Sequence, residues 1–306
     1  MRVPVMRIPS PAQIRGVISR AGAWLSDKLH LIISIFREAW FTFHHTHATE
    51  GAASIAYYSL FSLFPLLLVL IVAGSYMLQQ TNVQQVLLEW VVESIPGSRE
   101  LILQNIQQVL ALRGTFGLVA LISLVWSASG VFNTMAANIN RAFPEAQTRN
   151  FFTNRIVALA MIGGLVVIIF LLLFFNTIFR LIPHIDIPIL GTGHQTRVWQ
   201  IFSLTFPILL NFLVFYLLYW WVPNTNVSRR ASFIGALFTT VISRLFTLLF
   251  SLYLSSGFDR YEIVYGSLGT IVALMFFIYF TGWIVLFGAH LTASISRRIK
   301  GIPPLF

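Results

Sequence analysis

The feature that most constrains this chain is a set of apolar stretches that are each long enough to cross a lipid bilayer. A spanning helix needs about 20 mostly apolar residues. Six segments meet this requirement: Ala52–Leu78, Thr115–Ile139, Ile156–Ile178, Ile201–Val222, Ala231–Leu254 and Tyr265–Ala289. They predict an all-α integral membrane protein built as a bundle of six transmembrane helices.

The composition excludes an ordinary soluble domain. The chain has 306 residues, of which 57% are hydrophobic and 10% are charged, whereas a soluble domain carries about 25% charged residues. A water-facing surface cannot be covered by so few charges. The absence of cysteine excludes disulfide and thiolate chemistry. The net charge of +10 would suit nucleic acid, but the placement of the basic residues indicates membrane topology instead, so we expect no nucleic-acid partner.

Lysine and arginine concentrate on the cytoplasmic side of membrane proteins. With a cytoplasmic N-terminus, the six spans leave five basic residues outside: Arg99, Arg113, Arg180, Arg197 and Arg260. The cytoplasmic side then holds Arg2, Arg7, Arg15, Arg20, Lys28, Arg37, Arg141, Arg149, Arg155, Arg229, Arg230, Arg297, Arg298 and Lys300. This separation predicts that both termini are cytoplasmic.

Two further regions have helical spacing without being long enough to span. Apolar residues recur on one face between Ile14 and Phe36, with basic residues between them. This pattern predicts an amphipathic helix on the cytoplasmic leaflet or one packed against the cytoplasmic end of the bundle. Residues 79–113 predict two short amphipathic helices that cap an outer cavity or rest on the surface. We expect an amphipathic segment at 1–46, the transmembrane domain at 47–296 and a basic tail at 297–306.

Arg244 is a permanent charge in the middle of the fifth predicted span. It lies thirteen residues after Ala231, which is about 20 Å along a helix, so its side chain cannot easily reach either surface. Thr240, Thr247 and Ser251 share its helical face. An ionisable residue at this depth indicates function or a structural clamp on backbone carbonyls. The topology predicts no acidic partner at its depth, which favours a hydrated cavity or an anionic ligand.

Other polar residues follow the predicted helices. A polar stripe in the second span includes Asn138 and ends at Arg141, and the fourth span holds Asn211 four residues after Pro207. Hydroxyls and small residues in membrane helices are also ordinary packing contacts, and Gly288 with Thr292 forms such a small-residue pair.

Enzymatic chemistry finds little support in the sequence. His44, His47 and Glu50 could share a helical face, but the spacing is not that of zinc-binding helices. The set of His184, Asp186 and His194 in an outer loop is equally weak. We expect no catalytic residue, no metal and no cofactor.

The motifs "AYYSLFSLFPLLL", "VPNT" and "YGSLG" resemble those of the YihY/BrkB family of bacterial inner-membrane proteins, over about residues 36–296. The resemblance implies six spans, cytoplasmic termini and a location in the inner membrane. The family was formerly labelled ribonuclease BN, a label regarded as mistaken, and members are linked to envelope phenotypes. Members often have Glu at the positions of Arg244 and His290, so an acid-based proton or cation pathway is not expected here.

These observations predict a transporter or flippase of an anionic amphiphile, such as a lipid or a lipid-linked envelope precursor. The alternatives are an envelope-assembly scaffold without transport and, least favoured, a membrane-bound ribonuclease. We expect anionic membrane lipids as partners, and homo-oligomerisation is left open. The predicted substrate pathway comprises Arg244, Asn211, Thr240, Thr247, Ser251, Asn138, Arg141, Tyr57, Tyr58, Glu50 and His290.

Overall fold

The computed structural model describes residues 11–77, 113–181, 192–265, 267–303 and 305. These residues form seven helices: α1 Pro11–His45, α2 Ala48–Met77, α5 Arg113–Arg141, α6 Phe151–Leu181, α7 Thr192–Trp221, α8 Arg229–Tyr265 and α9 Ser267–Ile299. No strand occurs among the described residues, which confirms the predicted all-α class. The short helices predicted in the first outer loop lie outside the described residues.

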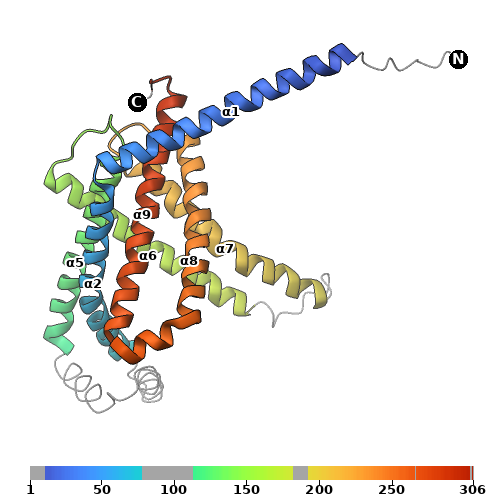
Figure 1. The fold of residues 1–306 in the computed structure, drawn as a ribbon. Coiled ribbons are helices and arrows are strands. Elements are labelled where there is room, and N and C mark those ends of the chain that lie inside the picture. Colours follow the sequence, from blue (N-terminus) through green and yellow to red (C-terminus); the bar gives the residue numbers. More distant parts are fainter. Residues whose placement is uncertain (1–10, 78–112, 182–191, 266, 304, 306) are drawn as a thin grey trace.

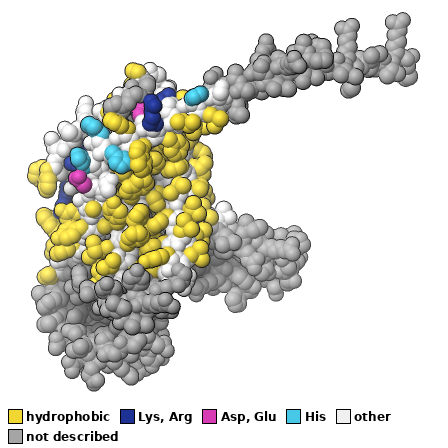
Figure 2. All heavy atoms as spheres, viewed as in Figure 1, with side chains coloured by type: hydrophobic (Ala, Val, Ile, Leu, Met, Phe, Trp, Pro, Cys, Tyr) yellow, Lys and Arg dark blue, Asp and Glu magenta, His cyan; other side chains and the backbone are white. Residues whose placement is uncertain are grey.

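The surface of the bundle is that of a membrane protein. Within the described residues, three stretches are long and apolar enough to cross a membrane: Phe151–Ile168, Arg229–Ser255 and Ile271–Ile299, with a shorter apolar stretch at Thr205–Trp221. Figure 2 shows a broad band of hydrophobic side chains below one end where basic, acidic and histidine side chains gather. Such an extended exposed apolar surface is the mark of contact with lipid.

The main helix contacts follow a row in the order α6–α5–α2–α9–α8–α7, and the two end helices also touch each other. Helix α2 packs against both α5 and α9, and α9 packs in turn against α8 and α1. Helix α6 packs mainly on α5, and α7 packs mainly on α8. Helices α6 and α7 therefore lie at the two ends of this row and close it through a smaller contact with each other. Both slope away from the upright α2, α8 and α9 (Figure 1).

Helices α8 and α9 approach closely because glycine and threonine alternate across their interface. A Cβ atom on Gly235 of α8 would overlap the Thr292 hydroxyl of α9. A Cβ atom on Gly288 of α9 would overlap the Thr239 hydroxyl of α8. Each glycine thus receives the threonine of the other helix, which confirms that Gly288 and Thr292 form a close-packing pair.

Tyr219 attaches α7 to this interface. Its side chain is fully buried, and its hydroxyl donates to the Val285 carbonyl at 2.8 Å while lying 2.9 Å from the Thr239 hydroxyl. One phenol therefore joins α7, α8 and α9 at a single point, where a buried hydroxyl needs such partners.

One end of the bundle, here called the polar end, is formed by the last turns of α1, α5 and α9 and by the α5–α6 and α7–α8 loops. Asn224 of the α7–α8 loop donates its backbone N–H to Asn140 Oδ1 at 2.7 Å, and its carbonyl accepts from the Gln147 N–H of the α5–α6 loop at 3.4 Å. Arg149 of the α5–α6 loop donates to the Val222 carbonyl at 2.6 Å, and burial lowers the pKa of Arg149. The described basic residues predicted to be cytoplasmic lie on α1 or on the segments that meet at this end.

Helix α1 packs against the end of the bundle through its C-terminal part, and its placement on a lipid leaflet stays a prediction. Its C-terminal part packs on α9, with Ala39 and Phe43 fully buried. Further toward its N-terminus, Leu29, Ile32 and Ile33 are exposed, and the helix extends away from the bundle across the ends of α8 and α9 (Figure 1).

Candidate functional site

The contact between α7 and α8, here called the seam, gathers three of the predicted pathway residues. A notch in the seam is lined by Asn211 of α7 and by Thr240 and Arg244 of α8, together with Pro207 and Ile208. Its volume of about 30 Å³ is that of roughly one water molecule. The sequence placed these side chains at similar depth, and the antiparallel pairing of α7 with α8 brings them together.

Arg244 lies near the middle of the apolar stretch Arg229–Ser255 and is exposed on the protein surface. Within the described part of the chain, Arg244 has no carboxylate within ion-pair distance and donates to no backbone carbonyl. The neighbouring Thr240 hydroxyl donates to its own helix, at 2.7 Å from the Ala236 carbonyl. This arrangement does not support a structural clamp, and it leaves the guanidinium N–H groups open to water or to an anion.

A wider groove on the seam lies nearer the polar end. Its volume is about 610 Å³, and its lining residues are Phe212, Leu213, Tyr216, Arg229, Arg230, Phe233 and Ile234. The Phe212 and Phe233 rings meet edge to face at 5.1 Å between centroids, and the Arg229 guanidinium stacks over the Trp220 ring at 5.4 Å. The groove is apolar and carries two arginines at one end, so its polarity is complementary to that of an anionic lipid.

The groove was missed by sequence reasoning, although a signal was present. Phe212, Tyr216 and Trp220 recur every four residues on α7, directly before the Arg229–Arg230 pair. Aromatic rings on one helical face beside paired arginines favour a membrane-interface site.

The rest of the predicted hydroxyl stripe does not line the notch. Thr247 is exposed, and its hydroxyl donates to the Ser243 carbonyl at 2.9 Å. Ser251 is also exposed. Their place on a pathway stays a prediction.

Asn138, Tyr57 and Tyr58 lie on the α2–α5 side of the row, away from the seam. Asn138 is buried, donates to the Thr134 carbonyl at 2.8 Å and fills the space left open by Gly51. Tyr58 packs over Gly130, and Tyr57 packs against Tyr58 with ring centroids 5.6 Å apart. The structure therefore gives these side chains packing contacts and does not bring them together with Arg244.

Glu50 and Arg141 are exposed at the polar end. Glu50 Oε1 lies 3.0 Å from Nδ1 of His47. The predicted face of His44, His47 and Glu50 is wrong, because α1 ends at His45 and α2 begins at Ala48. His47 lies between them with a left-handed φ of 55°. The equally weak set of His184, Asp186 and His194 lies outside the described side chains, and the described residues contain no group of three that could hold a metal ion.

His290 is buried, and both of its ring nitrogens have partners. Nδ1 lies 3.1 Å from the Thr42 hydroxyl, and Nε2 lies 3.2 Å from the Thr46 hydroxyl. Since the Thr42 hydroxyl donates to the Glu38 carbonyl at 2.9 Å, it accepts from Nδ1–H, and Nε2 accepts from Thr46. A neutral ring satisfies every bond, so His290 joins α9 to the α1–α2 junction.

An ionic cluster at the polar end was also missed. The buried carboxylate of Glu38 lies 3.7 Å from Arg297 Nε and 3.6 Å from Arg298 Nη2. Arg297 further pairs with Glu145 at 3.2 Å and donates to the Pro303 carbonyl at 2.8 Å. The cluster ties α1 to α9, to the α5–α6 loop and to the residues after α9.

Comparisons with known proteins relate this chain to a bacterial family and to proteins named as membrane proteins. The family model described as virulence factor BrkB matches residues 39–304. A ribonuclease-like protein of Bacillus subtilis, YfkH, is 26% identical over 271 residues, which cover 88% of this chain and 97% of that protein. A UPF0761 membrane protein of Vibrio parahaemolyticus is 26% identical over 277 residues, covering 90% of this chain and 86% of the relative. Another, from Pseudoalteromonas translucida, is 41% identical over 100 residues, which are 32% of this chain and 33% of that protein. No solved structure matches.

Proposed function

Because the chain belongs to the family described as virulence factor BrkB and is similar to proteins named as membrane proteins, we propose that it moves an anionic amphiphile across the membrane. The cargo is a lipid or a lipid-linked envelope precursor, carried by a transporter or flippase. The observation that carries the proposal is the notch where Arg244, Asn211 and Thr240 meet at mid-span.

The charge of Arg244 is the first step of the argument. A cation at membrane depth is costly unless it is hydrated or paired. Among the described residues, no acidic side chain pairs with it. An anionic head group would supply the missing charge and accept hydrogen bonds from the guanidinium, with the Asn211 amide beside it. A polar head group would thereby be stabilised at the depth where its passage costs most.

The shape of the seam supports the second step. The groove beside Arg229 and Arg230 can receive an amphiphile at the membrane surface. The notch is too small for a head group, so α7 must move away from α8 during passage. Pro207 lies inside α7 and removes one backbone hydrogen bond there, which makes this helix the natural one to bend. The tail of the cargo can stay in lipid throughout.

The topology belongs to the same proposal. We infer six spans with both termini cytoplasmic in the bacterial inner membrane, divided as residues 1–46, 47–296 and 297–306. The gathering of basic residues at the polar end supports this orientation. Anionic lipids are the expected partners, and self-association is left open.

The test is lipid translocation in reconstituted vesicles. Fluorescent phosphatidylglycerol placed in one leaflet should cross faster with the protein than without it, and Arg244→Ala should reduce that rate by about tenfold or more, as expected for a lost charge-assisted contact. Arg155→Ala is the matched control, since it removes an arginine that stacks on Trp126 outside the seam. Equal rates for wild type and Arg244→Ala would remove the assignment.

A scaffold without transport is the second candidate, and the small volume of the notch favours it. The chain has no cysteine, so Asn211→Cys introduces a single thiol that reports on access. A water-soluble maleimide should label this thiol in vesicles if the seam opens, whereas a scaffold that stays packed should leave it unlabelled.

The ribonuclease activity suggested by the name of YfkH has no ligand set among the described residues to support it. Its test is RNA cleavage by purified protein with Mg²⁺ or Mn²⁺, and we expect the RNA to remain intact.

A further inference from the structure

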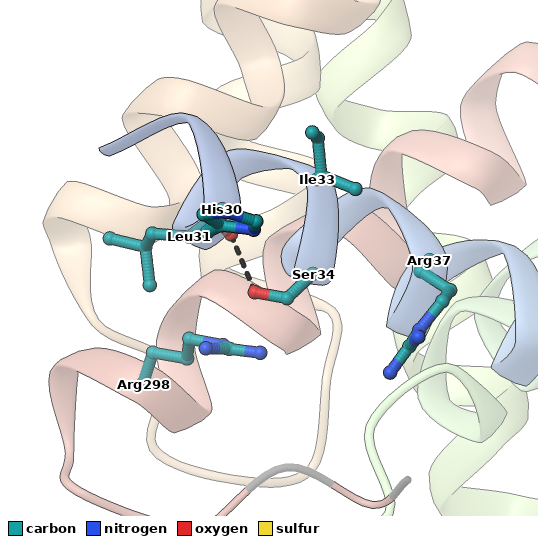
Figure 3. A pocket seen from close by; sticks show the side chains of 6 residues that line it. All are labelled: His30, Leu31, Ile33, Ser34, Arg37 and Arg298. Carbon is teal, nitrogen blue, oxygen red and sulfur yellow. Dashed lines mark hydrogen bonds between the residues drawn. The ribbon is translucent and has the colours of Figure 1, made fainter. Parts of the chain in front are cut away.

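A second polar site lies where α1 crosses the end of α9, and it shares no lining residue with the notch or the groove of the seam (Figure 3). The groove has a volume of about 470 Å³ and is lined by His30, Leu31, Ile33, Ser34, Arg37 and Arg298. Figure 3 shows Arg37 of α1 and Arg298 of α9 extending toward the same space from its two sides, with His30 and Ser34 between them. Two separate helices thus supply the basic side chains.

The local charge balance leaves the groove positive. The Glu38 carboxylate lies behind the groove and is shared by Arg297 and Arg298. Arg37 is exposed and has no carboxylate within ion-pair distance among the described residues. The buried Nε of Arg298 has no hydrogen-bond partner within that same part of the chain. The groove therefore carries positive charge, and the exposed guanidinium of Arg37 supplies N–H donors to it.

These donors suit a phosphate group. Guanidinium groups bind phosphate oxygens with two parallel N–H bonds, and arginines on opposite sides of a groove can hold one phosphate from two directions. The imidazole of His30 adds a further ring nitrogen.

The surroundings favour a lipid as the source of the phosphate. Leu29, Ile32 and Ile33 are 51%, 50% and 61% exposed on the neighbouring face of the same helix. One turn further on, Phe36 packs on Phe238 of α8 and Phe287 of α9. A basic face beside an exposed apolar face is the arrangement of a helix that lies at the head-group level.

We propose that this groove binds the phosphate of an anionic glycerophospholipid of the adjacent leaflet, whose acyl chains run along Leu29, Ile32 and Ile33. The site anchors α1 to the membrane surface. It stands apart from the transport proposal, since none of its residues lines the notch or the groove of the seam.

The test measures binding of dioctanoylphosphatidylglycerol to the purified full-length chain in detergent. The titration uses a protein that carries Arg229→Gln and Arg230→Gln, so that lipid binding at the seam groove adds as little as possible to the measured signal. Arg37→Gln should weaken binding about tenfold, as expected for a lost charge-assisted bond. Lys28→Gln removes a charge from the same helix outside the groove and should change the affinity less than twofold. Arg37 is exposed, so its variant should keep the melting temperature of the parent protein.

Three further measurements test whether the bound phosphate belongs to a lipid or to a soluble molecule. Dioctanoylphosphatidylcholine should bind at least about fivefold more weakly than phosphatidylglycerol, and Arg298→Gln should weaken the latter as Arg37→Gln does. Glycerol 3-phosphate should bind far more weakly than the lipid. If glycerol 3-phosphate binds as tightly, the site takes soluble phosphates and the lipid assignment fails. If Lys28→Gln weakens binding as much as Arg37→Gln, the attraction is diffuse and the site itself is overturned. A translocation assay that fails for Arg244 leaves each of these results unchanged.

Discussion

The polar end and the seam are built in opposite ways. At the polar end, Glu38, Tyr219 and His290 are buried and each bonds to a neighbouring helix. Along the seam, Arg244 is exposed, and the Thr240 hydroxyl bonds within its own helix. Helix α7 takes part in both, because Tyr219 fixes its last turns while Pro207 lies further from that attachment. The molecule thus combines a polar end whose buried side chains bond the helices to one another with a seam where the described polar side chains make few bonds between helices.

The largest effect should come from the ionic cluster. Glu38→Ala leaves the buried guanidinium of Arg297 and the partly buried one of Arg298 without this carboxylate, which should lower the free energy of unfolding by about 3–5 kcal/mol. Glu50→Ala is the matched control, because its side chain is 77% exposed and should cost less than about 0.5 kcal/mol. Denaturation in mixed micelles compares the two, and equal losses would refute a special role for the cluster.

The glycine contact between α8 and α9 should come next. Gly288→Ala places a methyl group on the Thr239 and Tyr219 hydroxyls, and such overpacking should cost up to about 3 kcal/mol. Gly163→Ala is a control inside α6, where nothing lies within 4 Å of the added carbon. It should be neutral or stabilise by about 0.5–1 kcal/mol. Both follow from thermal unfolding in detergent, and a neutral Gly288→Ala would show that the helices can separate at little cost.

A smaller loss is expected at the attachment of α7. Tyr219→Phe removes the donor to the buried Val285 carbonyl while keeping the ring, which should cost about 1 kcal/mol. Tyr216→Phe, on the partly exposed groove face of the same helix, should cost less. Hydrogen exchange of the last turns of α7 should rise in the first variant alone; unchanged exchange there would mean that Tyr219 does not fix this end.

The smallest change in stability should follow removal of the mid-span charge. Arg244→Leu replaces an exposed cation in an apolar stretch, so stability should stay within about 0.5 kcal/mol or rise, even though translocation is lost. Denaturation of the same preparation used for transport gives the value. A decrease in the free energy of unfolding above about 1 kcal/mol would identify Arg244 as a structural clamp. The seam would then stabilise the fold as the polar end does.

The sequence predicted the helices well because apolar length and the period of 3.6 residues are local properties. It also predicted that Arg244, Asn211 and Thr240 belong together, since each lies at mid-depth of its span and α7 precedes α8 directly. It could not predict the roles of Asn138 and His290, whose partners come from other helices. Glu38 and Arg297 are far apart in the chain, and nothing local indicates that their charges meet.

The helical face of His44, His47 and Glu50 was wrong for a different reason. The segment lacks glycine or proline between the two helices, so the left-handed turn at His47 had no ordinary sequence signal. Histidine is nevertheless among the residues more often found in that conformation. The seam groove and the α1–α9 groove depend on tertiary packing, and each became visible only when two helices were placed side by side.

The crossing of α1 over α8 and α9 has a mechanical consequence. With α1 anchored at the membrane surface as proposed, this helix would resist tilting of the upright helices to which it is joined. Any tilt of the bundle would then lift one side of α1 into water or press its charges into hydrocarbon. The ionic cluster and the His290 contacts fix the angle between α1 and α9, so the proposed anchoring would couple the orientation of α9 in the bilayer to the depth of α1.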